Sequence, residues 1–383
     1  MSRLFNAAVG EPPKQVTAHA ARRQALKRRV IACVSATAAL VVAGSIGLVV
    51  AANAIVPHRA ANGQPQVTMP KYYFEMDPTN PVSGTSENVV RSVATGAITG
   101  RVHCPGRSSL TLGATTDSRQ AFFIECLTNS KTGKSDETRI YRFQVSDSGR
   151  VSGFRMLPGG NLPKFLGQNM AVTADGSLLA IAEAERPEVL VINTKTGSHA
   201  VWHSDALPGG AILYPRDLSF ARGDRELAIF GSDYCVSGSV CKPVQEMRVV
   251  SPAAKGGKVS SGRQVLIKSQ LVPLKRGSIA DAFLGPDGRT VLATVDTYLA
   301  AGGTSPGVRV LRFSVVTGKA QRTLFNPASY KQALITYVDQ SGRFVLLKVL
   351  KKHDEVPVFG MIDHGKLRLL QPIRPRVADV IAW

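Results

Sequence analysis

Two kinds of polar turn recur along the chain in a fixed order, and an apolar run follows each of them. The first kind stands at 174–176, 286–288 and 340–342, with weaker versions at 116–118 and 222–224. The second kind ends in glycine and stands at 94–96, 147–149, 195–197, 316–318 and 363–365, with a degenerate member at 255–257. Asp-Gly and Thr-Gly between alternating apolar runs indicate hairpins, because glycine accepts the positive φ that tight turns require.

The spacing of these turns constrains the fold class. Successive turns of the second kind are about 50 residues apart, which allows four strands in each repeat, and this is the size of one blade of a β-propeller. Six such units account for residues 71–383, with seven blades as the alternative count. A β-sandwich would also contain many short strands, but the repeated pair of turns favours an all-β six-bladed β-propeller with four-stranded blades.

The two ends of the repeat predict how the ring closes. The first unit begins at Tyr72 and lacks the strand that precedes the first turn in the other units. The chain ends in an unpartnered strand at 376–383, and part of it resembles residues 279–284 of the fifth unit. We therefore expect this terminal strand to complete the first blade, which would leave no open sheet edge.

A hydrophobic segment near the N-terminus predicts a membrane anchor. Residues 30–57 contain no charged side chain, and a helix that spans the hydrocarbon core needs about 20 such residues. Arg22, Arg23 and 27–29 form a basic cluster directly before it, which keeps that end in the cytoplasm. We expect a cytoplasmic tail (1–29), a transmembrane helix (30–57), a linker (58–70) and an extracytoplasmic propeller (71–383). Cleavage near Ala54 is the alternative and would release the same domain.

The charge of the chain indicates its partners. Residues 1–29 account for +6 of the formal net charge of +20, so the exported part keeps +14. A basic domain outside a cell meets anionic wall polymers, lipid headgroups or acidic proteins. Nucleic acid fits the charge equally well, but the predicted location argues against it.

Four of the five cysteines fall in the exported part, as expected for an oxidising compartment. Sequence alone permits three pairings among Cys104, Cys126, Cys235 and Cys241. The short Gly/Ser loop between Cys235 and Cys241 favours a local bridge, which leaves Cys104–Cys126 as the other pair. A zinc site is the competing interpretation, and the cysteine spacing disfavours it.

At this level the chain resembles the membrane-anchored WD-repeat-like or TolB-like propeller proteins of actinobacteria. The resemblance rests on residues 90–96, on the Asp-Gly turns and on the terminal Ala-Asp-Val-Ile-Ala-Trp, and it covers roughly residues 70–383. The His and Trp-Asp signature of true WD repeats is absent. The resemblance implies a propeller of six or seven blades and no particular chemistry.

The sequence contains no recognisable catalytic motif and implies no cofactor or metal. The residues seven positions before the first-kind turn residues 176, 224 and 288 are Asn169, Asp217 and Asp281. Asp379 takes the corresponding place in the final strand. Innermost strands line a propeller's channel, so these side chains are candidates to bind a cation or a basic ligand there. The alternative is that each caps its own strand by bonding to backbone N–H groups. Thr111 and Ile335 occupy this position in the other two units.

The predicted function is non-enzymatic: a membrane-tethered propeller that binds a protein, a peptide or an envelope component. One alternative is a metal-dependent propeller hydrolase, lactonase- or cyclase-like, which would need converging acidic or His ligands. The other is a sensor that relays binding to a cytoplasmic partner through residues 1–29.

Overall fold

The computed structural model describes the chain in fifteen stretches that begin at Met69. They are 69–77, 87–105, 108–115, 121–128, 137–207, 212–234, 244–253, 255–267, 277–297, 307–326, 329–339, 342–354, 357–363, 365–370 and 380–382. The predicted tail and transmembrane helix lie outside them, so their outcome stays a prediction. Within the described stretches, no helix combines the length and the apolar character needed to cross a membrane.

The described strands form six sheets, which we number as blades from the N-terminus, naming strands from the innermost outward. Blade 1 contains β25 (Val380–Ala382), β1 (Tyr72–Asp77), β2 (Glu87–Ser92) and β3 (Ile98–Val102). Blade 2 contains β4 (Ser108–Thr115), β5 (Ala121–Thr128), β6 (Glu137–Val145) and β7 (Val151–Pro163). Blade 3 contains β8 (Gly167–Val172), β9 (Leu178–Glu183), β10 (Glu188–Asn193) and β11 (His199–His203).

The second half of the ring repeats this arrangement. Blade 4 contains β12 (Ile212–Ala221), β13 (Glu226–Tyr234), β14 (Gln245–Val250) and β16 (Arg263–Ile267). Blade 5 contains β17 (Gly277–Leu284), β18 (Thr290–Thr297), β19 (Gly307–Ser314) and β20 (Ala320–Phe325). Blade 6 contains β21 (Tyr330–Val338), β22 (Val345–Lys351), β23 (Val358–Asp363) and β24 (Lys366–Leu369). The fold is an all-β six-bladed β-propeller.

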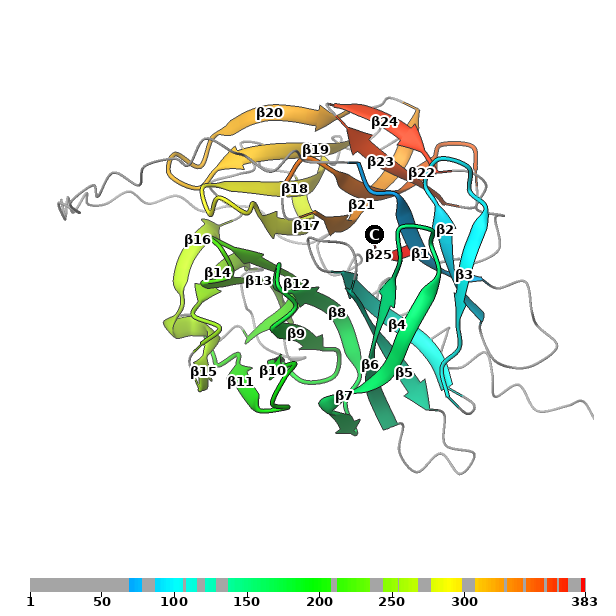
Figure 1. Cartoon of the computed structure of the whole chain (residues 1–383). Coiled ribbons are helices and arrows are strands. Elements are labelled where there is room, and N and C mark those ends of the chain that lie inside the picture. Colours follow the sequence, from blue (N-terminus) through cyan, green and yellow to red (C-terminus); the bar gives the residue numbers. More distant parts are fainter. Residues whose placement is uncertain are drawn as a thin grey trace, which may run out of the picture. The chain divides into compact units, whose positions relative to one another are not determined.

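The innermost strands form a closed ring around the centre. Each contacts the next in the order β4, β8, β12, β17 and β21, and β25 lies between β21 and β4 (Figure 1). β25 pairs antiparallel with β1, so blade 1 combines its three N-terminal strands with a strand from the end of the chain. The two ends of the domain are thereby held in one sheet.

Apolar side chains fill the spaces between neighbouring blades. Phe74 of blade 1 packs against Phe143 of blade 2 at a centroid distance of 5.4 Å, and Phe143 stacks on Phe122 at 5.2 Å. All three rings are buried. Alternate residues of each middle strand point to opposite neighbours, because successive side chains of a strand lie on opposite faces.

The repeated turns occupy equivalent places in the blades. Turns of the first kind join the innermost strand to the second, and turns of the second kind join the third strand to the fourth. The degenerate member departs from the pattern, because residues 256–258 form a short strand, β15 (Gly256–Lys258), that pairs parallel with β11 of blade 3. A Cβ at Gly256 would meet the carbonyl oxygen of Val201 at 2.2 Å, so this pairing requires glycine.

Candidate functional site

Every innermost strand carries a β-bulge. The extra, unpaired residues are Thr111, Gln168, Arg216, Ala280, Thr336 and Ile381. A bulge places two residues opposite one on the partner strand and re-aims the side chains beside it. Asn169, Asp217 and Asp281 each follow the bulge directly, so the sequence spacing identified structurally equivalent positions in blades 3, 4 and 5.

The equivalence does not extend around the whole ring. In blade 2 the residue after the bulge is Leu112, one position after Thr111, which the sequence count gave. In blade 6 it is Tyr337, two positions after the counted Ile335. In β25 the pairing places Ala382 after the bulge. Asp379 itself lies outside the described residues.

Asp217 and Asp281 each bond to the blade that follows their own. The Asp217 carboxylate accepts a hydrogen bond of 3.0 Å from the backbone N–H of Ala282 in blade 5. The Asp281 carboxylate accepts one of 3.2 Å from the N–H of Ile335 in blade 6. Both carboxylates are buried. They do bond to backbone N–H groups, but across a blade interface instead of at the start of their own strand.

Burial raises the pKa of Asp217 to about 6, although the positive charge of Arg216 and the bond from the Ala282 N–H oppose the shift. Nowhere in the described stretches do three or more His, Cys, Asp or Glu side chains come together as a group suited to a metal ion. Asp217 and Asp281 therefore act, in this structure, as links between blades.

The disulfide prediction is confirmed for one pair. Cys104 follows β3 and bonds to Cys126 of β5, with a Cα–Cα distance of 5.7 Å. The competing zinc interpretation is wrong for these two cysteines, because their sulfurs are bonded to each other. Cys235 and Cys241 lie outside the described residues, so their pairing stays a prediction.

The outermost strand of blade 2 carries a second type of irregularity. Along β7, residues 157–160 have no paired partner on β6 between the pairs that Met156 and Asn161 make with that strand. Gly159, with φ of +66°, belongs to this segment, which we call the β7 bulge. The His199 Nε2 is 2.8 Å from the Gly159 carbonyl oxygen, so the β7 bulge touches blade 3.

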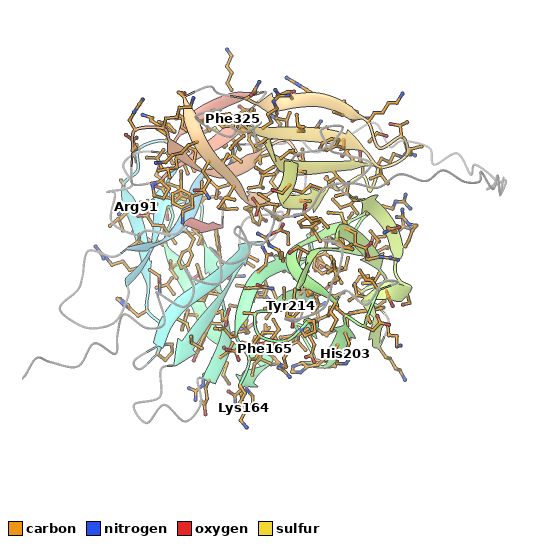
Figure 2. The ribbon with its side chains drawn as sticks, turned by 180° about the vertical axis from the view of Figure 1, so that it is seen from behind. Arg91, Lys164, Phe165, His203, Tyr214 and Phe325 are labelled. Carbon is orange, nitrogen blue, oxygen red and sulfur yellow. A yellow bond between two sulfur atoms is a disulfide. The ribbon has the colours of Figure 1, made fainter. Side chains whose placement is uncertain are left out.

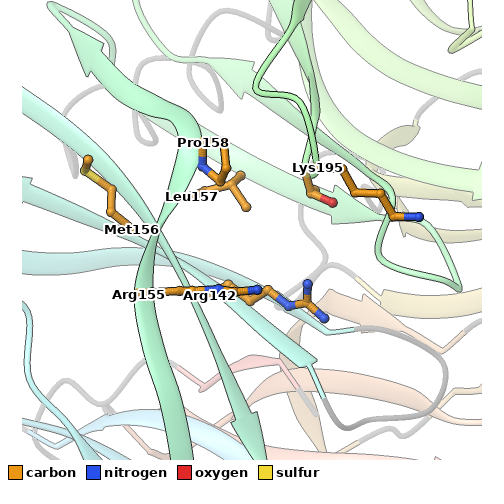
Figure 3. Close-up of a pocket in the computed structure, with 7 residues that line it drawn as sticks. Arg142, Arg155, Met156, Leu157, Pro158 and Lys195 are labelled. Carbon is orange, nitrogen blue, oxygen red and sulfur yellow. The ribbon is translucent and has the colours of Figure 1, made fainter.

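Beside the β7 bulge lies a cavity of about 380 Å³ between blades 2 and 3 (Figure 3). Its lining combines three cationic side chains with an apolar wall and one threonine: Arg142, Arg155, Lys195, Met156, Leu157, Pro158 and Thr194. Figure 3 shows Leu157 and Pro158 on one side and Lys195 on the other. No carboxylate of a described residue lines this cavity, which we call the cationic cavity.

The cations of this cavity lack acidic partners within the described part of the chain. None of the three makes an ion pair with a described carboxylate. Arg142 instead lies over the ring of Phe123, with its Cζ 5.7 Å from the centroid. The charge of Lys195 acts at longer range, on the pKa of Asp175. Burial raises this pKa, but the hydrogen bonds with Ser177 and Thr173, together with the positive charge of Lys195, outweigh burial and lower the pKa.

In a neighbouring cavity, carboxylates compensate the positive charge. It measures about 240 Å³ and is lined by residues that follow the β7 bulge, together with Arg186, Glu188 and His199. Arg186 is paired with Glu183 at 3.2 Å and with Glu188 at 3.5 Å, so its charge is compensated. His203 also lies 3.3 Å from Glu188. The cationic cavity is therefore the better site for an anion.

The arrangement can bind a carboxylate or a phosphate that is joined to an apolar group. A guanidinium offers a planar pair of N–H donors that matches these anions, and the resulting bonds are stronger than neutral ones. Sequence reasoning missed this site because its residues come from two blades. One signal was present: Pro158-Gly159-Gly160 interrupts a strand, and glycine inside a strand often marks a bulge.

The chain matches no protein-family model and no curated protein. Its similarity to solved structures is distant. A putative TolB from Agrobacterium tumefaciens is 10% identical with a TM-score of 0.46, over 78% of this chain and 88% of that one. The periplasmic gluconolactonase of Pseudomonas aeruginosa is 14% identical with a TM-score of 0.43, over 81% and 99%.

The hydrazine synthase of Kuenenia stuttgartiensis is 14% identical, with a TM-score of 0.38. The match covers 67% of this chain and 64% of that one, so it spans less than two thirds of the synthase chain. These likenesses, at 14% identity or less, concern the architecture alone. What the chain binds has to be argued from its own side chains.

Proposed function

We propose that this chain is a non-enzymatic propeller, tethered to the membrane by residues 30–57, that binds an anionic envelope component outside the cytoplasm. The uncharged segment and its flanking basic cluster support the tether. The cationic cavity supports the anionic ligand, and it is the observation that carries the proposal.

The cavity selects for an anion because no carboxylate of the described residues neutralises its positive charges. Arg142 and Arg155 come from paired strands of blade 2, where they stand directly opposite each other. Lys195 approaches from the turn between β10 and β11 of blade 3. An anion between the two blades would relieve the repulsion among these like charges, as well as accept their hydrogen bonds.

The apolar wall narrows the class of ligand. Met156 is 49% exposed, which is unusual for a large apolar side chain in this structure, and it adjoins Leu157 and Pro158 in the lining. We therefore propose a ligand in which a carboxylate or phosphate lies next to an aliphatic or aromatic group. An acidic peptide segment of an envelope protein has this chemistry.

Calorimetric titration of the full chain in nanodiscs with the peptide acetyl-Phe-Glu-Glu tests this site. We expect saturable binding that weakens about ten-fold in Arg155→Gln and in Lys195→Gln, because each variant removes a charge-assisted hydrogen bond. Arg289→Gln, an exposed arginine of blade 5, is the matched control and should bind as the wild type does. Binding that is absent, or that is equal in all four proteins, would refute the proposal.

A second candidate function is a propeller hydrolase, and one observation favours it. Asp217 lies buried on an innermost strand with a pKa of about 6, a value suited to proton transfer near neutral pH. Its carboxylate is already bonded to the Ala282 N–H, which suits a structural role equally well. Turnover of a lactone panel by the wild type, abolished in Asp217→Asn, would establish this candidate in place of the first.

A further inference from the structure

The outer strands of blades 5 and 6 carry an unusual set of exposed side chains. β20 and β24 contact each other at the rim of the ring (Figure 1). The first four residues of β20 are exposed, and so are three of the four residues of β24. We call the surface formed by residues 315–325 and 365–370 the β20–β24 face.

Positive charge dominates the β20–β24 face. Lys319, Arg322, Lys366 and Arg368 are all exposed, and neither segment contains an aspartate or a glutamate. Arg322 approaches the turn before β24, where its Nη2 lies 3.1 Å from the point at which a Cβ on Gly365 would stand. The cations of the two blades thus form one patch.

No ion pair joins these four cations to a carboxylate of the described residues. Blade 4 offers a contrast, because Arg263 of its outer strand is paired with Glu226 at 3.1 Å. The charge of the β20–β24 face therefore remains available to an external partner.

Apolar side chains are interleaved with the cations. Val316, in the turn before β20, is 84% exposed, and Leu369 of β24 is 40% exposed. They are two of the four large apolar side chains that are exposed in the described part of the chain. Basic residues beside exposed apolar ones are typical of surfaces that rest on anionic lipid.

The described chain enters the propeller at this same place. The Arg368 Nη1 donates a hydrogen bond of 3.6 Å to the sulfur of Met69, the first described residue. Met69 also packs against the core cluster that contains Phe344 and Leu370. Residues 58–68, which precede it, connect it to the predicted anchor, and Pro57 to Met69 spans at most about 40 Å.

We propose that the β20–β24 face docks on anionic lipid headgroups and holds the propeller edge-on to the bilayer; this inference rests on the proposed tether. The chain leaves the propeller beside Arg368, so the tether brings this face to the bilayer before any other rim surface. Four uncompensated cations then meet headgroup phosphates, and Val316 and Leu369 reach the interfacial region. The cationic cavity lies between blades 2 and 3, away from this face.

Hydrogen exchange of the full chain in nanodiscs tests the docking. One nanodisc preparation contains phosphatidylcholine alone, and the other also contains phosphatidylglycerol. Amides on the outer edges of β20 and β24 have no neighbouring strand in their own sheets, so they should exchange rapidly unless lipid covers them. We expect slower exchange in peptides from 315–325 and 365–370 with phosphatidylglycerol, and a return to fast exchange at high salt.

Variants identify the residues responsible. Each cation near an anionic surface contributes about five-fold to the docking equilibrium, so Arg322→Gln/Arg368→Gln should weaken docking about 25-fold and remove the protection. Arg150→Gln/Lys164→Gln, two exposed cations that flank β7 in blade 2, is the control and should keep the protection.

Carbonate extraction of the same samples tests the membrane tether separately from the docking. A chain that resists extraction but exchanges equally in both lipids overturns the docking and leaves the tether standing. A chain that carbonate releases refutes the tether, and the docking with it. Protection that appears only when soluble polyglycerol phosphate is added to phosphatidylcholine nanodiscs also overturns the lipid assignment, because it makes a wall polymer the partner.

Discussion

At the scale of single residues, the buried carboxyl group of Asp217 makes the free energy of unfolding depend on pH. Its pKa is raised to about 6 in the folded protein from an ordinary value of 3.8, so the folded state binds this proton more tightly than the unfolded state does. The resulting contribution to stability is complete below about pH 3.8 and is lost as the pH rises through about 6. A shift of this size corresponds to at most about 3 kcal/mol.

We therefore expect Asp217→Asn to flatten part of the pH dependence of folding. The amide keeps an oxygen that can accept the Ala282 N–H, but it cannot ionise. The free energy of unfolding of the variant, relative to the wild type, should rise between pH 4.5 and pH 7.5 in denaturant titrations. Asp175→Asn should show the opposite trend, and only below about pH 4, because the pKa of Asp175 is lowered and the wild type loses this carboxylate's contribution as the pH falls. Parallel pH profiles for Asp217→Asn and the wild type would contradict the prediction.

Gly159 permits the contact between the β7 bulge and blade 3. A Cβ there would stand 2.3 Å from the Gly197 carbonyl oxygen and 2.7 Å from the His199 Nε2. Gly159→Ala should therefore lower the free energy of unfolding by about 3 kcal/mol, from the strained φ and the backbone clash together. Gly153, in the same strand with φ of +64°, would place its Cβ 3.9 Å from its nearest neighbour, the Gln144 Oε1.

Gly153→Ala is thus the matched control, with the same backbone strain and no clash, and it should cost about 1 kcal/mol. Guanidinium denaturation of both variants measures the difference. Equal losses would show that the β7 bulge can move away from blade 3 at no cost.

At the scale of elements, the blade pattern could be predicted because each turn is local. Gly149 and Gly318 adopt the positive φ that their turns require, and each joins the third and fourth strands of its blade as expected. The disulfide Cys104–Cys126 was the pair left over once the short Gly/Ser loop favoured a local Cys235–Cys241 bridge, and the structure confirms it. The cationic cavity did not follow, because Arg155 and Lys195 lie on different blades and no short-range pattern relates them. The inter-blade bond of Asp217 escaped prediction for the same reason.

The disulfide joins two elements that belong to different blades. Cys104 lies in the connection that leaves β3, and Cys126 lies in β5, 22 residues later. A cross-link over a loop of this length restricts the unfolded chain by about 3 kcal/mol. Cys104→Ala/Cys126→Ala should unfold at a correspondingly lower guanidinium concentration, and wild type treated with reductant should approach it. An unchanged midpoint in the double variant would show that packing of blades 1 and 2 alone fixes this connection.

At the scale of the whole molecule, stability depends on a ring in which each blade is held by two neighbours. Blade 1 is the only one assembled from both ends of the described chain, and β25 provides its contacts with the inner strands β4 and β21. Without β25, the inner edge of β1 would be left unpaired, and two adjacent inner strands would lose a neighbour. The remaining five blades would keep their own sheets but form an open arc.

Deletion of residues 376–383 should therefore destabilise all six blades, not only the first. Loss of the β1 pairing and of two inner-strand contacts removes several kcal/mol, and at about 2–4 °C per kcal/mol for large domains we expect the melting temperature to fall by about 10 °C or more. Moving the same eight residues to a position before Met69, through a short Gly/Ser turn, supplies the strand from the other direction and should restore most of the loss. Calorimetry distinguishes the outcomes: a truncated chain that melts at the wild-type temperature would mean that the ring does not need its closing strand.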